Sequence, residues 1–242
     1  MSAEKFFTKE NLDVYLKALG KEFRKLNGTK MPAELVLIGG AAVLANYGFR
    51  DLTNDIDAII RSSSVMKEAV NRVGDEHGLP TGWLNMDFSK TTSYSGRLEE
   101  ISVYYKTFSN ILEVRTVAAE YLIAMKLKSG RQYKYDLSDI AGILWEHKKR
   151  GDPITKEKIY NAVEKLYGSP ELPEASKEVL DIVFESDNYE QIYKETRESE
   201  IKFRKEMLKT AKEQPLAVRE ESAYYIIKKA KEIKQRSQSN EN

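Results

Sequence analysis

The stretch from residue 35 to residue 60, LVLIGGAAVLANYGFRDLTNDIDAII, constrains the fold more than any other part of the chain. It begins with an apolar run, Leu35–Ile38, which breaks at Gly39 and Gly40 and continues as an alanine-rich segment, Ala41–Tyr47. Short apolar runs bounded by glycine are typical of buried strands, and the periodicity of the alanine-rich segment is typical of a helix. The sequence therefore predicts a strand, a glycine turn and a helix in direct succession.

Two aspartates open the second apolar run of this stretch, which ends at Ile60. If this run is a strand, Asp55 and Asp57 project from one face, about 6 to 7 Å apart along the chain. Carboxylates beside apolar residues are costly to bury unless a cation lies between them. Because Mg²⁺ prefers carboxylate oxygens, the pair predicts a site for Mg²⁺ or Mn²⁺. The alternative is an exposed strand end whose aspartates only cap neighbouring turns.

The glycine pair has two interpretations. Backbone N–H groups at the start of a helix bind phosphate with the help of the helix dipole, so Gly39 and Gly40 are candidate nucleotide-binding residues. A tight turn without a ligand explains the pair equally well. No Gly-Lys-Ser/Thr follows it, which argues against a P-loop, and the third glycine and ribose-binding acid of dinucleotide-binding folds are missing.

Periodicity and turn residues predict elements on both sides of this stretch, and together they give an α/β chain. The N-terminal helix is expected at 8–27 with Thr8 as its N-cap. Residues 83–87 are expected to form a loop and residues 89–96 a mobile polar segment. The other predicted elements are a helix at 65–73 closed by Gly74 and by Gly78–Pro80, an antiparallel hairpin of 101–105 with 111–117, and helices at 118–127 and 135–148.

The composition changes at Asp152, where strands disappear and charged amphipathic helices follow. The segment Gly151–Pro153 is a plausible boundary between a domain of residues 1–150 and a helical domain of residues 151–236. Residues 237–242 are polar and are expected to form a disordered tail. The helices expected after the boundary are 155–167, 174–184, 189–213 and 217–234.

A third carboxylate is expected near the aspartate pair, because two metal ions held together clamp the attacking and leaving oxygens of an in-line transfer. Glu113 is the first candidate, since it lies on the second strand of the hairpin, where alternation directs it to one face. Asp87 is the competitor. Strands at a protein surface also carry glutamates that bind nothing.

Basic residues around the end of the helix at 118–127 form a second candidate site. Lys126, Lys128 and Arg131 are positioned to neutralise a triphosphate, and Asp136 and Asp139 to pair with these cations or orient them. The alternative is a solvated helix end. The basic cluster of residues 228–236 in the C-terminal helices is a further candidate contact for RNA phosphates, against the same alternative.

Composition narrows the functional classes. The net charge of +1 excludes a strongly basic body, so a nucleic-acid contact would need a local patch. The chain has no cysteine, and its two histidines are too few for a histidine zinc site. No apolar stretch has the length of a membrane span or the form of a signal peptide, so we expect a cytoplasmic protein that binds no membrane. No feature of the sequence specifies an oligomeric state.

The order of strand, Gly-Gly, helix, Arg/Thr and Asp-Ile-Asp resembles the signature of the nucleotidyltransferase superfamily that includes DNA polymerase beta. More narrowly, the chain resembles nucleotidyltransferase-like proteins related to the AbiEii-type toxins of toxin–antitoxin and phage-defence systems. The matching pieces lie between residues 35 and 145: LIGGAAV at 37–43, TNDIDAII at 53–60, WLN at 83–85 and EYLIAMKLKSGRQYKYDLSDI at 120–140.

The resemblance implies a mixed sheet flanked by helices and a set of site residues. Asp55 and Asp57, with Glu113 as the expected third carboxylate, would hold Mg²⁺ or Mn²⁺. The nucleoside triphosphate would contact Gly39, Gly40, Thr53, Lys126 and Arg131, with Asp136 and Asp139 around the nucleotide and acceptor. Two departures stand out: Gly40 replaces the superfamily's usual serine, which removes a hydroxyl, and Arg50 lies further from Thr53 than the resemblance predicts.

Three hypotheses follow. The first is a metal-dependent nucleotidyltransferase that moves a nucleoside monophosphate to an acceptor hydroxyl on RNA, such as tRNA, or on a protein. If the toxin resemblance holds, a cognate antitoxin is an expected partner. The second is a catalytically silent module of the same fold that binds a protein or RNA. The third is a helical interaction protein in which the acidic pair only caps turns.

Overall fold

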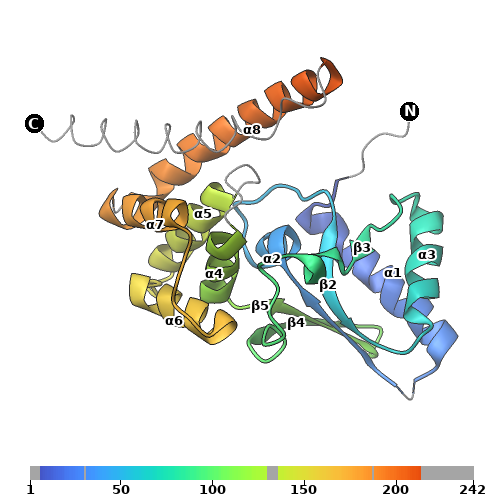
Figure 1. Ribbon diagram of the computed structural model, residues 1–242. Coiled ribbons are helices and arrows are strands. Elements are labelled where there is room, and N and C mark those ends of the chain that lie inside the picture. Colours follow the sequence, from blue (N-terminus) through green and yellow to red (C-terminus); the bar gives the residue numbers. More distant parts are fainter. Residues whose placement is uncertain (1–5, 30, 130–135, 187, 214–242) are drawn as a thin grey trace, which may run out of the picture. The chain divides into compact units, whose positions relative to one another are not determined.

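The computed structural model describes residues 6–29, 31–129, 136–186 and 188–213, with side chains described as far as residue 202. The chain divides into two compact units, Met1–Leu122 and Ile123–Asn242, and the division falls inside helix α4 (Ala119–Ser129). Figure 1 shows the elements of both units. The boundary predicted at residues 150 and 151 lies within the second unit.

The first unit is built on a five-stranded mixed sheet with the order β3-β2-β1-β5-β4. Strand β1 pairs antiparallel with β2 and parallel with β5, while β3 runs parallel to β2 and β4 antiparallel to β5. This confirms the predicted mixed sheet flanked by helices. The strands are β1 (Ala33–Leu37), β2 (Ile56–Arg61), β3 (Leu84–Asn85), β4 (Ser102–Phe108) and β5 (Leu112–Val117).

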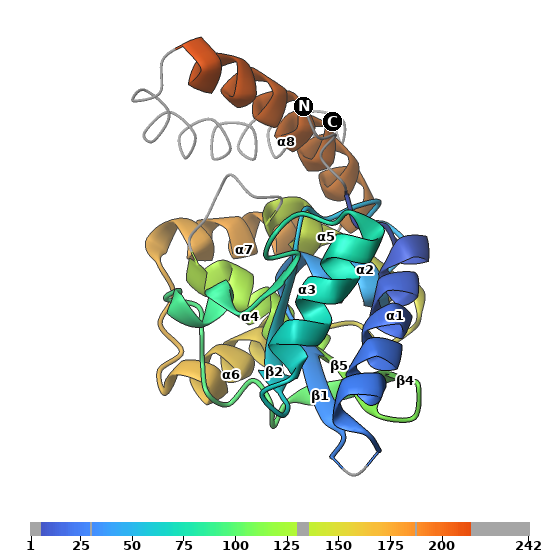
Figure 2. The same ribbon diagram turned by 90° about the vertical axis from the view of Figure 1, so that its right-hand side faces the viewer.

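Helices α1 (Lys9–Asn27) and α3 (Met66–His77) lie side by side against the sheet, as Figure 2 shows. Thr8 is the N-cap of α1, as predicted, and its hydroxyl oxygen accepts from the Asn11 backbone N–H. The Thr8 backbone N–H donates to Asn11 Oδ1, which completes a capping box. The short helix α2 (Gly39–Asn46) connects β1 to β2, and a 3₁₀ turn, η1 (Asp87–Lys90), follows β3.

The two faces of the sheet differ in polarity because side chains alternate along each strand. Leu35 and Leu37 of β1 and Val114 of β5 are buried on the face that α1 covers. The opposite face also buries apolar side chains, Val36 and Ile59 among them, but it carries the polar ones that are only partly buried: Glu34, Asp57, Glu113 and Arg115. It is called the polar face below. The candidate site therefore lies on the polar face.

Two predictions about residues 65–87 differ from the structure. Helix α3 continues past Gly74 to His77 and ends at Gly78, the second of the predicted stops, and the expected loop contains strand β3. Trp83 is 2% exposed, and its Nε1 donates to the Val70 carbonyl oxygen of α3. A Cβ at Gly74 would lie 3.3 Å from the Trp83 ring, so this glycine lets the indole approach the helix.

The hairpin of β4 and β5 was predicted correctly, and its turn has an unusual backbone. Ser109 and Asn110 both have positive φ, 54° and 55°, although neither is glycine. This combination is the turn that matches the twist of two antiparallel strands. The polar segment 89–96, expected to be mobile, instead buries Ser93 and Ser95.

The second unit is helical. Its elements after α4 are α5 (Asp136–Lys149), α6 (Lys156–Tyr167), α7 (Glu174–Ser186) and α8 (Tyr189–Glu213), close to the predicted ranges. Thr155 caps α6, and Gly168 ends it in the left-handed conformation. The helix predicted at 217–234, the basic cluster at 228–236 and the tail at 237–242 lie outside the described residues.

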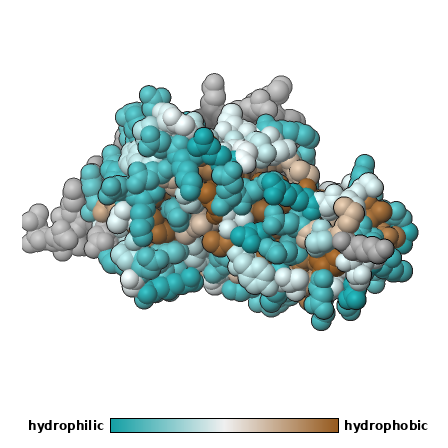
Figure 3. Space-filling model, turned by 90° about the horizontal axis from the view of Figure 1, so that it is seen from below, coloured by the Kyte–Doolittle hydropathy of each residue, from teal (hydrophilic) through white to brown (hydrophobic). Residues whose placement is uncertain are grey.

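None of the helices among the described residues is long and apolar enough to cross a membrane. On the face shown in Figure 3, hydrophilic side chains predominate, and hydrophobic ones are scattered between them in small groups.

Candidate functional site

The aspartate pair lies where β2 begins. Asp55 directly precedes the strand and is exposed, and Asp57 is its second residue and is partly buried. Ile56 between them is fully buried. Because alternation along β2 directs Ile56 into the core, it directs Asp57 to the polar face. That Asp55 shares this face stays a prediction, because Asp55 precedes the strand.

The glycine turn comes close to Asp57. The Ile38 backbone N–H donates to the Asp57 carbonyl oxygen at 2.9 Å, which ties the end of β1 to β2. Gly39 has φ +54°, and a Cβ built on it would lie 3.8 Å from Asp57 Oδ2. Glycine adopts this left-handed conformation without the steric cost of a side chain. The first residue of α2 and the carboxylate of Asp57 are therefore near neighbours.

Gly40 has a different role, because its neighbours leave no room for a side chain. A Cβ at this position would lie 2.6 Å from Thr53 Oγ1 and 2.8 Å from Arg50 Nη2. The serine that is usual in the superfamily would clash here. The hydroxyl of Thr53 and the guanidinium of Arg50 occupy the space instead, so the turn retains a hydroxyl beside it.

Thr53 is held in place by the N-terminal segment. Its backbone forms a two-way bridge with Phe7, with N–H to oxygen distances of 2.8 and 2.9 Å. Phe7 is fully buried and stacks on Trp83 at a ring distance of 6.2 Å. Arg50 is fixed as well, because its Nε donates to the Leu52 carbonyl oxygen at 3.1 Å. Hydrogen bonds thus hold the Thr53 backbone and the Arg50 side chain beside Gly40.

The start of α2 can attract an anion. Its N-cap residue is Ile38, which has no polar side chain to cap the helix, and the first turn carries no acidic residue. The first backbone N–H groups of any helix lack partners within the helix and carry the positive end of its dipole. This supports phosphate binding at Gly39 and Gly40, which remains a prediction.

Glu113 does not lie with the aspartate pair. The strand register aligns it with Glu34 of β1, and Glu34 with Arg61 of β2, four residues beyond Asp57. At about 3.3 Å per residue and 4.8 Å per strand, the Cα atoms of Glu113 and Asp57 are roughly 16 Å apart. Glu113 instead accepts from Arg115 Nη1 at 2.8 Å. The register therefore does not support Glu113 as the third carboxylate.

The other candidate, Asp87, is exposed and forms an ion pair with Lys90 at 2.7 Å. Across the part of the chain that the structure describes, no three acidic, histidine or cysteine side chains are grouped so that they could hold a metal ion. The candidate metal site therefore has two carboxylates, Asp55 and Asp57.

These residues fit Mg²⁺ by their chemistry. Both side chains are hard oxygen donors on the same strand, and Mg²⁺ is usually bound by one or two carboxylates while it keeps several waters. The glycine at position 39 places no side chain against Asp57 Oδ2.

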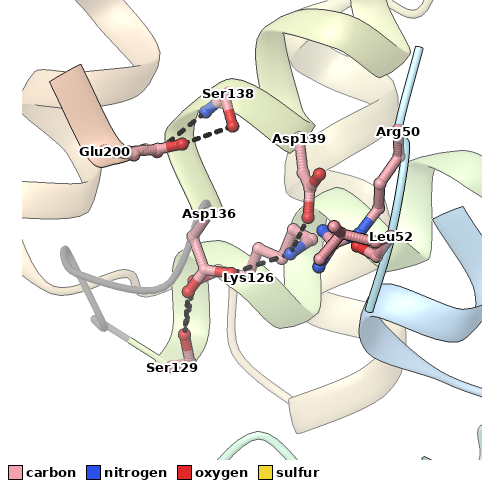
Figure 4. A network of polar contacts seen from close by, with 8 residues as sticks. All are labelled: Arg50, Leu52, Lys126, Ser129, Asp136, Ser138, Asp139 and Glu200. Atoms are coloured by element: carbon pink, nitrogen blue, oxygen red, sulfur yellow. Dashed lines mark hydrogen bonds and ion pairs between the residues drawn. The ribbon is translucent and has the colours of Figure 1, made fainter. Parts of the chain in front are cut away.

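The second predicted group comes together inside the second unit (Figure 4). Lys126 of α4 forms ion pairs with Asp136 at 2.7 Å and with Asp139 at 2.8 Å, both on α5. The Lys126 side chain is 9% exposed and that of Asp139 is 2% exposed. The Ser129 hydroxyl donates a hydrogen bond to Asp136 Oδ2 at 3.3 Å. Of the cations predicted to pair with these aspartates, Lys126 pairs with both.

This pairing changes what Lys126 offers to a phosphate. Two carboxylates outnumber the single ammonium group, so much of its positive charge is already neutralised. Buried ion pairs of this kind mainly fix the geometry of the helices that carry them. Lys128 is partly buried, donates to the Glu171 carbonyl oxygen and lies 5.3 Å from the centroid of the Tyr167 ring, and Arg131 lies outside the described residues.

Glu200, which lies on α8, was not among the predicted site residues. It accepts from the backbone N–H of Ser138 at 3.2 Å and from the Ser138 hydroxyl, so it caps the first turn of α5 from another helix (Figure 4). Burial raises the pKa of Glu200 to about 7, and nearby Asp139 adds to this. A glutamate on a long charged helix carries no sequence signal of such a contact.

Comparison with known proteins gives one match. The family model described as a nucleotidyltransferase of unknown function (DUF6036) matches residues 15–196. No curated protein and no solved structure matches the chain. The matched range covers the glycine turn, both aspartates and the cluster around Lys126. The chain therefore belongs to this nucleotidyltransferase family.

Proposed function

We propose that this protein is a Mg²⁺-dependent transferase that moves a nucleoside monophosphate from a nucleoside triphosphate to an acceptor hydroxyl. The observation that carries the proposal is the approach of the glycine turn to the carboxylate of Asp57. It supports a phosphate and a metal ion bound side by side. The family membership supports the same class of reaction.

The reaction replaces one phosphate ester bond by another. The acceptor oxygen attacks the α-phosphorus, the bond from this phosphorus to the bridging oxygen breaks, pyrophosphate leaves, and the hydroxyl proton passes to water. Mg²⁺, when bound, supplies the positive charge that neutralises the phosphates. Asp55 and Asp57 would hold the ion, and the N–H groups of Gly39 and Gly40 would bind phosphate oxygens.

The neighbours of Gly40 would add to this phosphate site. Arg50 and Thr53 lie against the glycine and are 9% and 5% exposed. A guanidinium and a hydroxyl are both donors to phosphate oxygens. Positioning of this kind supplies most of the catalysis in phosphoryl transfer.

Label transfer from each α-³²P-labelled nucleoside triphosphate tests the proposal. The purified protein is incubated with Mg²⁺ and either total RNA or a protein extract. Wild type is compared with Asp55→Asn/Asp57→Asn, in which two neutral amides replace the carboxylates. Label transfer that depends on both aspartates supports the proposal. Equal transfer by both proteins, or none by either, overturns it.

Glu113→Gln is the matched control, because it removes a carboxylate from the same face of the sheet, four residues along the register from Asp57. It is expected to transfer label as wild type does. If it lost transfer to the same extent as the aspartate variants, the assignment of the metal site would be wrong.

We further propose an RNA or protein acceptor and a role as a toxin, and the AbiEii-type resemblance supports both. The acceptor would be the end of an RNA such as tRNA, or a hydroxyl side chain of a protein. Induced expression in a bacterial host is expected to arrest growth with wild type and not with Asp55→Asn/Asp57→Asn. Unimpaired growth with wild type would remove the toxin role and leave the transferase proposal to the labelling experiment.

A further inference from the structure

The shortest strand of the sheet places an amide beside the candidate metal site. Strand β3 has two residues, Leu84 and Asn85, and it pairs in parallel with β2 so that Asn85 aligns with Asp57. Aligned residues of neighbouring strands project from the same face, and the strands lie about 4.8 Å apart. Asn85 is thus the immediate neighbour of Asp57 across the sheet.

Burial agrees with this register. The aligned pair of Ile56 and Leu84 is buried, at 0% and 5% exposed. The next aligned pair, Asp57 and Asn85, is partly exposed on the opposite face. The amide and the carboxylate therefore share the polar face of the sheet.

The core holds Asn85 in this position. The Ile56 backbone N–H donates to the Trp83 carbonyl oxygen at 2.9 Å, and the buried Trp83 ring is bonded to α3. The side chain is fixed as well: Asn85 Oδ1 accepts from the Asp87 N–H at 2.8 Å, and Nδ2 donates to the Gly82 carbonyl oxygen at 3.3 Å. An amide oxygen has two lone pairs, so Oδ1 retains the capacity for a second partner.

The acidic neighbours of Asp57 do not complete the site. Along its row of the sheet the register continues through Val117 of β5 to Ser102 of β4, and Glu113 lies in another row. Mg²⁺ takes six oxygen ligands and accepts amide oxygens beside carboxylates. A neutral oxygen next to Asp57 is the donor that this part of the sheet offers.

We propose that Asn85 supplies an oxygen ligand to the divalent cation held by Asp55 and Asp57, in place of a third carboxylate. This inference rests on the proposed function and names a further residue of the same site. Two carboxylates and an amide match the charge of one Mg²⁺ ion. They leave the charge of the bound phosphates to be neutralised by other groups, such as Arg50.

The test measures binding of Mn²⁺ to the full chain without nucleotide, by electron paramagnetic resonance of the free ion and by calorimetry. Asn85→Ala is expected to weaken Mn²⁺ binding by at least about tenfold, because even the loss of a residue that only contacts the metal's ligands costs 10- to 100-fold. Asn85→Asp is expected to tighten it, because affinity rises with the charge of the ligands. Circular dichroism verifies that both variants fold.

Asn54→Ala is the matched control, since Asn54 is an exposed asparagine next to Asp55 in the sequence and lies outside the strands β2 and β3. It is expected to bind Mn²⁺ as wild type does. A loss as large as that of Asn85→Ala would overturn the assignment of the amide ligand.

Asp57→Asn separates this inference from the proposed function. If Asp57→Asn retains Mn²⁺ binding, the metal site itself fails. If Asp57→Asn loses binding while Asn85→Ala binds as wild type, the proposed site stands and the role of Asn85 is overturned. If Asn85→Ala does not fold, Asn85→Asp decides, and an unchanged or weaker affinity in that variant overturns the role.

Discussion

Lys126 Nζ lies 2.8 Å from Asp139 Oδ2, and the carboxylate that it neutralises is 2% exposed. The two residues belong to successive helices, α4 and α5, so this ion pair fixes one helix against the other. Removal of one member leaves the other charge buried without its partner, which is far more costly than the loss of an exposed pair.

Lys126→Ala is therefore expected to lower the free energy of unfolding by roughly 3 kcal/mol. Urea denaturation checks this, with Lys128→Ala as the control, because Lys128 lies on the same helix but contacts the Glu171 carbonyl oxygen and the Tyr167 ring, so its removal leaves no buried carboxylate behind. The double variant Lys126→Ala/Asp139→Ala is expected to lose less than the sum of the two single changes. Strict additivity would contradict the pairing.

The pH dependence of stability is expected to report Glu200. Its pKa is raised from 4.5 to about 7, chiefly because the side chain is buried. The folded state then holds this proton more tightly than the unfolded state, so the free energy of unfolding falls as pH rises from about 4.5 to 7. At 1.36 kcal/mol per pKa unit, this contribution amounts to roughly 3 kcal/mol.

Glu200→Gln is expected to remove this slope and to be more stable than wild type above pH 7. The amide still accepts the Ser138 N–H, and it donates to the Ser138 hydroxyl. The charged groups around the carboxylate are Asp139 on α5, which raises its pKa, and Arg197 on α8, which lowers it. Urea denaturation at a series of pH values checks this, and equal slopes in the two proteins would contradict it.

Replacement of either glycine of the turn by alanine is expected to lower the stability of the fold, for a different reason at each position. Gly40→Ala places a Cβ against Thr53 and Arg50, and overpacking of this kind costs about 1 to 3 kcal/mol. Gly39→Ala has space but strains the left-handed backbone, at about 1 kcal/mol. Thr53→Ala is expected to rescue part of the loss in Gly40→Ala and none in Gly39→Ala.

Gly48→Ala is the control for these thermal denaturation measurements, because no atom lies within 4 Å of the added Cβ. A loss of stability in Gly48→Ala as large as in Gly40→Ala would show that the contacts of the turn do not set the cost.

The hairpin turn is expected to gain stability from residues that prefer its backbone. Ser109→Asn and Asn110→Gly each place a residue suited to positive φ where the chain has 54° and 55°. Each change is expected to raise the free energy of unfolding by about 0.5 to 1 kcal/mol. Thermal denaturation checks this, and a lower midpoint for Asn110→Gly would contradict the turn geometry.

The sequence by itself determined most of the helices and strands, because these depend on local signals. Helical periodicity and the Thr8 cap located α1, and alternation along β2 placed Asp57 on the face opposite to the buried Ile56. Helical spacing likewise located α4 and α5, which carry Lys126, Asp136 and Asp139.

Only the tertiary structure decided which residues from separate strands and helices meet. Strand register depends on which strands pair along the whole chain. It places Glu113 far from Asp57 and aligns Asn85 with Asp57. The same holds for Gly40, whose missing side chain is explained by Thr53 and Arg50, and for Glu200, which reaches α5 from α8. Local patterns specify the face on which a side chain lies, whereas packing and pairing decide its neighbours.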